Sequence, residues 1–152
     1  MPDLRGREKY ENELAAALLL SWDDAINTAL TGAEPDWDRL KASIKAESAA
    51  SLHATALAAA LMLMQELSGT RRLPAGFDVS NGQPEALARG LVSTRRAEWK
   101  STPDPQAWVD RWMSRDAAKS IAITEVTTAV GHGEAKLRSE FDDGRLAARA
   151  CM

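Results

Sequence analysis

The chain has 152 residues, 45% hydrophobic and 27% charged, which is enough to bury the core of one globular domain. Its net charge of -3 is uneven: residues 1–69 carry six Lys/Arg against eleven Asp/Glu (-5), and residues 70–152 carry thirteen against eleven (+2). Neither balance predicts a general nucleic-acid surface. The single cysteine, Cys151, excludes a disulfide framework and favours a reducing compartment.

The first predicted element is a helix over about residues 5–30. Apolar side chains recur along it at four-residue steps, at Tyr10, Leu14, Leu18, Trp22, Ile26 and Leu30. Thr31-Gly32 predicts its end, because glycine commonly follows the last helical residue. The short apolar run 14–20 is preceded by acidic residues, which is the wrong charge for a signal peptide.

A second, longer helix is predicted over about residues 35–67, with Pro35 in its first turn. Its apolar stripe comprises Trp37, Leu40, Ile44, Leu52, Ala56, Ala59, Ala60, Leu63 and Leu67. The short connection predicts that the two helices form an antiparallel hairpin. The apolar run 49–64 is shorter than the ~18 residues of a membrane span, so we expect a buried helix, a soluble protein and no membrane partner.

Residues 70–83 are expected to form a linker, because they are rich in glycine and proline and contain the turn pair Asn81-Gly82. The chain then divides into the helical hairpin 1–69 and a second helical region 84–152, which we expect to form one compact unit.

A third helix is predicted from Pro84 to about Lys100. Leu87, Leu91 and Val92 form its apolar stripe, and its other face is expected to carry Arg89, Arg95, Arg96 and Lys100. Asp104 and Pro105 suit the N-cap and first turn of a fourth helix. That helix carries Trp108, Val109, Trp112 and Met113 on one face, and either ends near Ser114 or continues into the next helix.

The last helix is predicted over about residues 115–141, where Ile121 and Glu125 follow Ala118 at three- and four-residue steps. Ala129 and Gly133 continue the same spacing. Small residues after a carboxylate suggest a close helix contact with a polar group at its centre; the alternative is a solvated helix flank with Glu125 on its edge. No segment alternates with a period of two, so the sequence predicts an all-α fold: a long hairpin followed by two or three further helices.

The sequence contains few residues in patterns that suit catalysis or metal binding. His53 and His132 are far apart in the sequence and neither has a metal ligand at a suitable spacing. No nucleophile elbow or phosphate-binding loop is found, and Asp142-Asp143-Gly144 is typical of a turn. The tryptophans suit helix packing. We therefore expect no enzyme, no catalytic or metal site and no cofactor.

The stretch Ile121-Ala122-Ile123-Thr124-Glu125 resembles a motif of the Mu F-like family of phage head morphogenesis (minor head) proteins. That family carries Ile-Ala-Arg-Thr-Glu on a helix, followed after three residues by Ala and after three more often by Gly. The residues that match in register are Ile121, Ala122, Thr124, Glu125, Ala129 and Gly133, with Arg115 and Ala118 in the lead-in. The resemblance covers about residues 84–145. Ile123 stands where the family usually has Arg, and the resemblance does not extend to the family's following region, which is rich in Trp, Asp and often Cys or His.

The resemblance implies a non-enzymatic minor head protein of a tailed phage that binds portal or capsid proteins, in the virion or the cytoplasm of the infected host. We expect the helix around Thr124 and Glu125 to form either an internal joint or a docking face. Thr124 is expected to hydrogen-bond to the carbonyl four residues earlier, and Glu125 to pair with Arg115, Lys119 or an arginine of a partner.

Three alternatives remain open. The face of Arg89, Arg95, Arg96 and Lys100 suits a small helical nucleic-acid-binding or regulatory protein, although the charge does not favour general DNA binding. A weaker alternative is an enzyme centred on Thr124 and Glu125. The alanine-rich surface 46–60 suits either a hairpin partner or self-association through the long helices.

Overall fold

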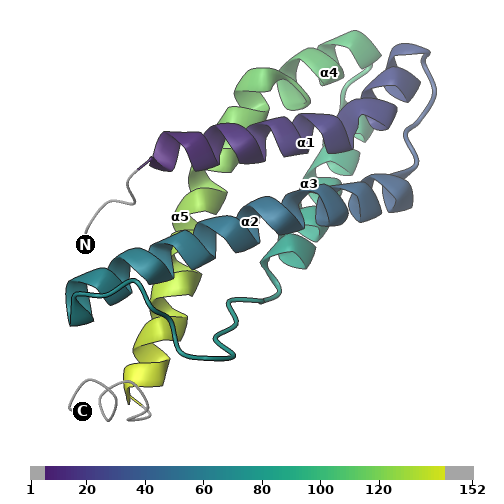
Figure 1. The fold of residues 1–152 in the computed structure, drawn as a ribbon. Coiled ribbons are helices and arrows are strands. Elements are labelled where there is room, and N and C mark those ends of the chain that lie inside the picture. Colours follow the sequence, from purple (N-terminus) through teal and green to yellow (C-terminus); the bar gives the residue numbers. More distant parts are fainter. Residues whose placement is uncertain (1–5, 143–152) are drawn as a thin grey trace.

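The computed structural model describes residues 6–142, and the side chains of residues 6–140, as five α-helices with no strand in that range. They are α1 (Arg7–Leu30), α2 (Trp37–Ser68), α3 (Gln83–Ser101), α4 (Pro105–Trp112) and α5 (Arg115–Asp142) (Figure 1). The predicted all-α class is confirmed. The predicted order, a long hairpin and then a second group of helices, is also confirmed.

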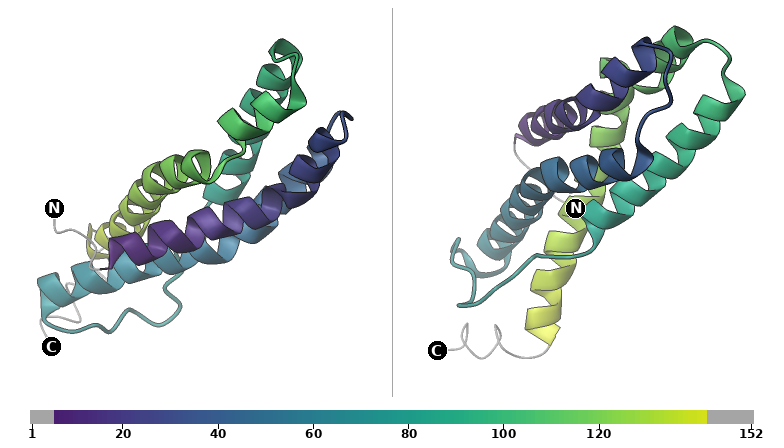
Figure 2. Two further views of the ribbon diagram at one scale, coloured as in Figure 1. Left: turned by 90° about the horizontal axis from the view of Figure 1, so that it is seen from above. Right: turned by 90° about the vertical axis from the view of Figure 1, so that its right-hand side faces the viewer.

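The hairpin consists of α1 and α2, which lie antiparallel and side by side along most of α1 (Figure 2). Side chains at four-residue steps explain this packing, because Leu14, Leu18 and Trp22 are fully buried. The start of α2 differs from the prediction. The Asp36 carboxylate accepts a hydrogen bond from the backbone N–H of Arg39 at 3.1 Å, so Asp36 is the N-cap and Pro35 lies before the helix.

The connection between α4 and α5 is a true break. Met113 leaves the helical region with φ -122° and ψ 24°, and the Ser114 hydroxyl accepts a hydrogen bond from the Ala117 N–H at 3.2 Å. Ser114 thus caps α5 with its side chain. The alternative of one helix running through Ser114 is excluded, whereas Asp104 and Pro105 begin α4 as predicted.

Both groups of helices contribute to one hydrophobic core. Trp108 of α4 is fully buried and meets Trp37 of α2 and Trp99 of α3 edge-on, with ring centroids 6.0 and 5.1 Å away. Its indole N–H donates to the Arg95 carbonyl at 3.0 Å. These tryptophans are packing anchors, as predicted from their spacing.

Helix α5 crosses α2 at very short range. A Cβ atom added to Gly133 would lie 2.0 Å from the backbone carbonyl oxygen of Ala56. Ala129, one turn earlier, is fully buried. The small residues of the motif therefore allow the two helix backbones to approach, as the spacing predicted.

Helix α2 is long and apolar enough to span a membrane, judged by length and composition alone. In this fold it is the central helix, packed against α1, α3 and α5, and its stripe from Leu40 to Leu63 is buried. Core helices pass the same test of length and apolarity.

Candidate functional site

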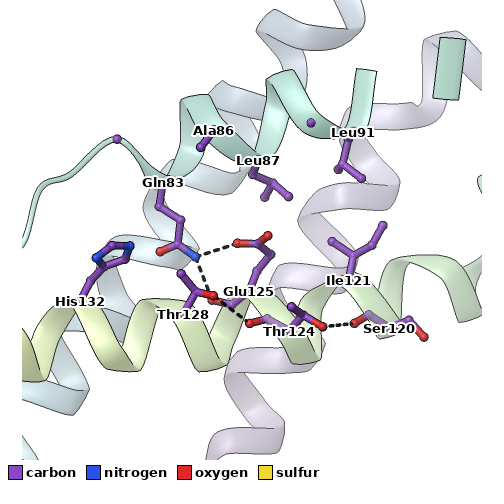
Figure 3. A pocket seen from close by; sticks show the side chains of 12 residues that line it. Gln83, Ala86, Leu87, Leu91, Ser120, Ile121, Thr124, Glu125, Thr128 and His132 are labelled. Carbon is purple, nitrogen blue, oxygen red and sulfur yellow. Dashed lines mark hydrogen bonds between the residues drawn. The ribbon is translucent and has the colours of Figure 1, made fainter. Parts of the chain in front are cut away.

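A groove of about 760 Å³ separates α3 from α5, which both pack against α2 (Figure 3). Apolar and small residues form most of its surface, together with a few polar groups. The residues that line it are Gly82, Gln83, Ala86, Leu87, Gly90 and Leu91 from the α3 side, and Ser120, Ile121, Thr124, Glu125, Thr128 and His132 from α5. Three of the motif residues, Ile121, Thr124 and Glu125, therefore border one concave surface.

One polar bridge crosses the groove. The side-chain amide of Gln83 donates from Nε2 to the Glu125 carboxylate and to the Glu125 backbone carbonyl, both at 2.9 Å (Figure 3). Gln83 is only 6% exposed, and its Oε1 atom is buried without a hydrogen-bond partner in the described part of the chain. The bridge leaves one buried acceptor unused.

The loop before α3 positions Gln83. The Asn81 side chain accepts a hydrogen bond from the Gln83 backbone N–H at 2.8 Å and donates one to the Val79 carbonyl at 2.9 Å. Val79 itself is buried in a cluster with Leu137 of α5. The start of α3 is thus held by the Asn81 side chain and by one apolar anchor, Val79.

The threonines of α5 bond within their own helix. Thr124 donates to the Ser120 carbonyl at 3.4 Å, and Thr128 donates to the Thr124 carbonyl at 3.3 Å. The hydrogen bond predicted for Thr124 is confirmed. Both residues are exposed, so their methyl and hydroxyl groups lie at the rim of the groove.

Glu125 does not pair with a cation of its own helix. It forms no ion pair within residues 6–140, and Lys119 instead bonds to Asn12 of α1. At 100° per residue, Lys119 points about 120° away from Glu125 around the helix. Pairing of Glu125 with Lys119 or with Arg115 is therefore wrong, and its partner in this structure is Gln83.

The predicted polar centre of the close helix contact is also wrong. Each four-residue step turns about 40° around the helix, so Gly133 lies about 80° from Glu125. Gly133 faces α2, whereas Glu125 faces α3. The residues of the motif all lie on α5, but they face two different neighbouring helices.

The basic face of α3 differs from the prediction at one position. Arg95 continues the apolar steps of Leu87 and Leu91 and is 8% exposed, with its guanidinium 5.3 Å from the Trp112 ring centroid. Burial lowers the pKa of Arg95. The exposed Arg89, Arg96 and Lys100 are joined by Lys41 of α2, and together they line a second groove of about 620 Å³.

Sequence reasoning missed Gln83 and Gly90. Gln83 was assigned to the linker, although Asn81 two residues earlier is a common capping residue. Gly90 in the middle of a helix was a signal as well, because glycine there is unfavourable without a packing or functional reason.

Within residues 6–140, no three His, Cys, Asp or Glu side chains lie close enough together to hold a metal ion. His132 lies at one end of the first groove, and His53 is exposed on α2. Cys151 and the predicted turn at Asp143-Gly144 lie outside the described residues. Comparisons of the chain with protein-family models, curated proteins and solved structures find no match.

Proposed function

We propose that this chain is a non-enzymatic minor head protein of a tailed phage, and that it binds portal or capsid proteins during or after head assembly. The observation that carries the proposal is that some motif residues of α5 are packed inside the protein, while others line an open groove. Gly133 fits α5 against α2 and Ala129 is buried, whereas Thr124 and Glu125 border an open groove. One short motif thus combines internal packing with an accessible surface, which suits an assembly protein.

This function places the protein in the virion or in the cytoplasm of the infected bacterium. The partners are the portal protein, the capsid protein or both. No chemistry is required of the groove, whose contribution is shape, apolar surface and the Glu125 carboxylate.

The test is mass spectrometry of gradient-purified particles from cells that express this gene with its neighbouring genes. We expect its peptides to co-purify with portal and capsid proteins at a fixed ratio. Protein that is found only in soluble lysate, with no binding to purified portal or capsid protein, would contradict the proposal.

A second candidate function is binding of nucleic acid in the groove between α2 and α3. The observation that favours it is four exposed cations, Lys41, Arg89, Arg96 and Lys100, none of which forms an ion pair within the described residues. Asp38 is the acidic residue among those that line this groove. Phosphate groups would meet a surface with a net positive charge there.

Salt dependence tests this candidate. If these cations contact phosphates, the affinity for duplex DNA should fall with salt at a slope of about -3 to -4 in log K against log salt. Arg96→Glu should reduce both the affinity and the slope, whereas Arg71→Glu in the exposed loop before α3 is the matched control. Equal effects of the two substitutions would exclude a specific role for the groove.

A further inference from the structure

The groove between α3 and α5 has the length and shape to accommodate one additional helix. Both helices pack on α2, and Gln83 of α3 is joined to Glu125 of α5 by the two hydrogen bonds of the polar bridge. The α5 side of the groove runs from Ser120 to His132, which corresponds to about 18 Å, or three helical turns. An incoming helix of three to four turns matches this length.

The surface of the groove suits an apolar helix face. Leu87 and Leu91 form the α3 wall and Ile121 the facing wall. The small residues Ala86 and Gly90 project little into the groove from α3. A Cβ atom added to Gly90 would meet no described atom within 4 Å. Small residues of this kind allow the backbone of another helix to approach closely.

Charge complementarity indicates one residue that the incoming helix should carry. The Glu125 carboxylate is the negative group of the groove lining, and it has no cation partner within residues 6–140. An ionised carboxylate accepts several hydrogen bonds, and a guanidinium group supplies five N–H groups in a planar arrangement that matches it.

We infer that the groove receives an amphipathic helix of a head component, and that this helix places an arginine among its apolar residues, opposite Glu125. This inference rests on the proposed function for the identity of the partner. The groove chemistry itself is testable without that partner.

The first experiment uses synthetic 16-residue amphipathic helical peptides, with leucines at i, i+3, i+4 and i+7 spacing and Arg, Gln or Glu at the centre of the stripe. Fluorescence anisotropy measures their binding to the full chain. We expect the Arg peptide to bind at least about tenfold more tightly than the Glu peptide. Glu125→Gln should remove this preference, whereas Glu47→Gln, which removes an exposed carboxylate outside the groove, should preserve it.

The second experiment blocks the groove without damaging the fold. In Gly90→Leu the new side chain enters open space, so the protein should fold while the Arg peptide loses at least about tenfold in affinity. Gly131→Leu is the matched control, since Gly131 also lies in a helix with open space around it but does not line the groove. A circular dichroism melt of each variant verifies folding.

Three results would overturn the inference: equal binding of the three peptides, equal binding by Gly90→Leu and the wild type, or equal effects of Glu125→Gln and Glu47→Gln. Sedimentation equilibrium adds a fourth. A dimer of the wild type that dissociates in Gly90→Leu would assign the groove to a second copy of this chain.

Failure of the inference is distinguishable from failure of the proposed function. A chain that co-purifies with particles, and still does so as Gly90→Leu, is a head protein that binds through another surface. A chain that prefers the Arg peptide but is missing from particles has the inferred groove without the proposed function.

Discussion

Helix α5 meets α2 without a gap and α3 across one, and a glycine lies on each of these surfaces. At the α2 crossing, the Cα of Gly133 faces the Ala56 carbonyl so closely that a Cβ atom would lie 2.0 Å from its oxygen. On the α3 side of the groove, a Cβ atom added to Gly90 would meet no described atom within 4 Å apart from its own helix backbone and chain neighbours. Glycine inside a helix costs about 0.5–1 kcal/mol relative to alanine. Close packing offsets that cost at Gly133, and no contact within the described chain offsets it at Gly90.

The comparison also separates rigid from adaptable parts of the motif. The contact at Gly133 is between backbones, which cannot move by rotation of a side chain. The contact at Glu125 is made by the Gln83 side chain, which bonds to both the carboxylate and the backbone carbonyl of Glu125, and a side chain can change its rotamer without a shift of the helix backbone. The α2–α5 crossing therefore fixes the position of α5, and the α3–α5 groove is the surface that accommodates change.

The largest expected effect is that of Gly133→Ala. The added methyl group overlaps the Ala56 backbone, so α2 and α5 must separate, and we expect the free energy of unfolding to fall by about 3 kcal/mol. Urea denaturation followed by circular dichroism measures the change. The double variant Gly133→Ala, Ala56→Gly should be no more stable, because the obstacle is a carbonyl group and not the Ala56 side chain.

Gly131→Ala is the control for this comparison, because it adds the same methyl group two residues away in open space. It should leave stability unchanged or raise it slightly. If Gly133→Ala behaves like Gly131→Ala, the helices are further apart than the structure indicates.

Glu125→Ala should have a smaller effect, a loss of about 1 kcal/mol. A buried ion pair at Glu125 would instead predict a loss of ~3–5 kcal/mol. The structure instead gives a half-exposed carboxylate bound to Gln83, and the Gln83 amide keeps the Glu125 backbone carbonyl as an acceptor after the substitution. A loss above about 3 kcal/mol in the urea midpoint analysis would show that Glu125 has a charged partner.

Gly90→Ala should stabilise the chain, by about 0.5–1 kcal/mol, because the helix gains alanine and the methyl group meets no described atom. Thermal melts of the isolated chain measure this gain. Destabilisation by Gly90→Ala would mean that the groove is narrower than the structure indicates. Gly90 would then be closely packed, as Gly133 is.

The sequence was sufficient to predict the helices, since four-residue apolar steps and caps such as Asp104 are local signals. It was also sufficient for the close approach at Gly133. It did not predict that Glu125 bonds to Gln83, because that contact joins residues 42 positions apart and depends on how α3 and α5 are placed on α2. The burial of Arg95 was missed because a charged residue was assigned to the exposed face, although its register is that of Leu87 and Leu91.

The smallest expected effect concerns the loop that positions Gln83 on the α3 side of the groove. Hydrogen bonds from the Ser80 side chain and backbone lower the pKa of the exposed Asp78 carboxyl, with Ser80 N at 2.8 Å from Oδ1. A lowered pKa means that the ionised form stabilises the fold above the unfolded value of about 4, and that this contribution is lost as the pH falls through the lower pKa of the folded state. Asp78→Asn should therefore be slightly less stable than wild type at pH 7, and the difference should shrink as the pH is lowered below about 4. Glu47→Gln controls for the loss of one charge, and a difference that grows on acidification would contradict the role of Asp78.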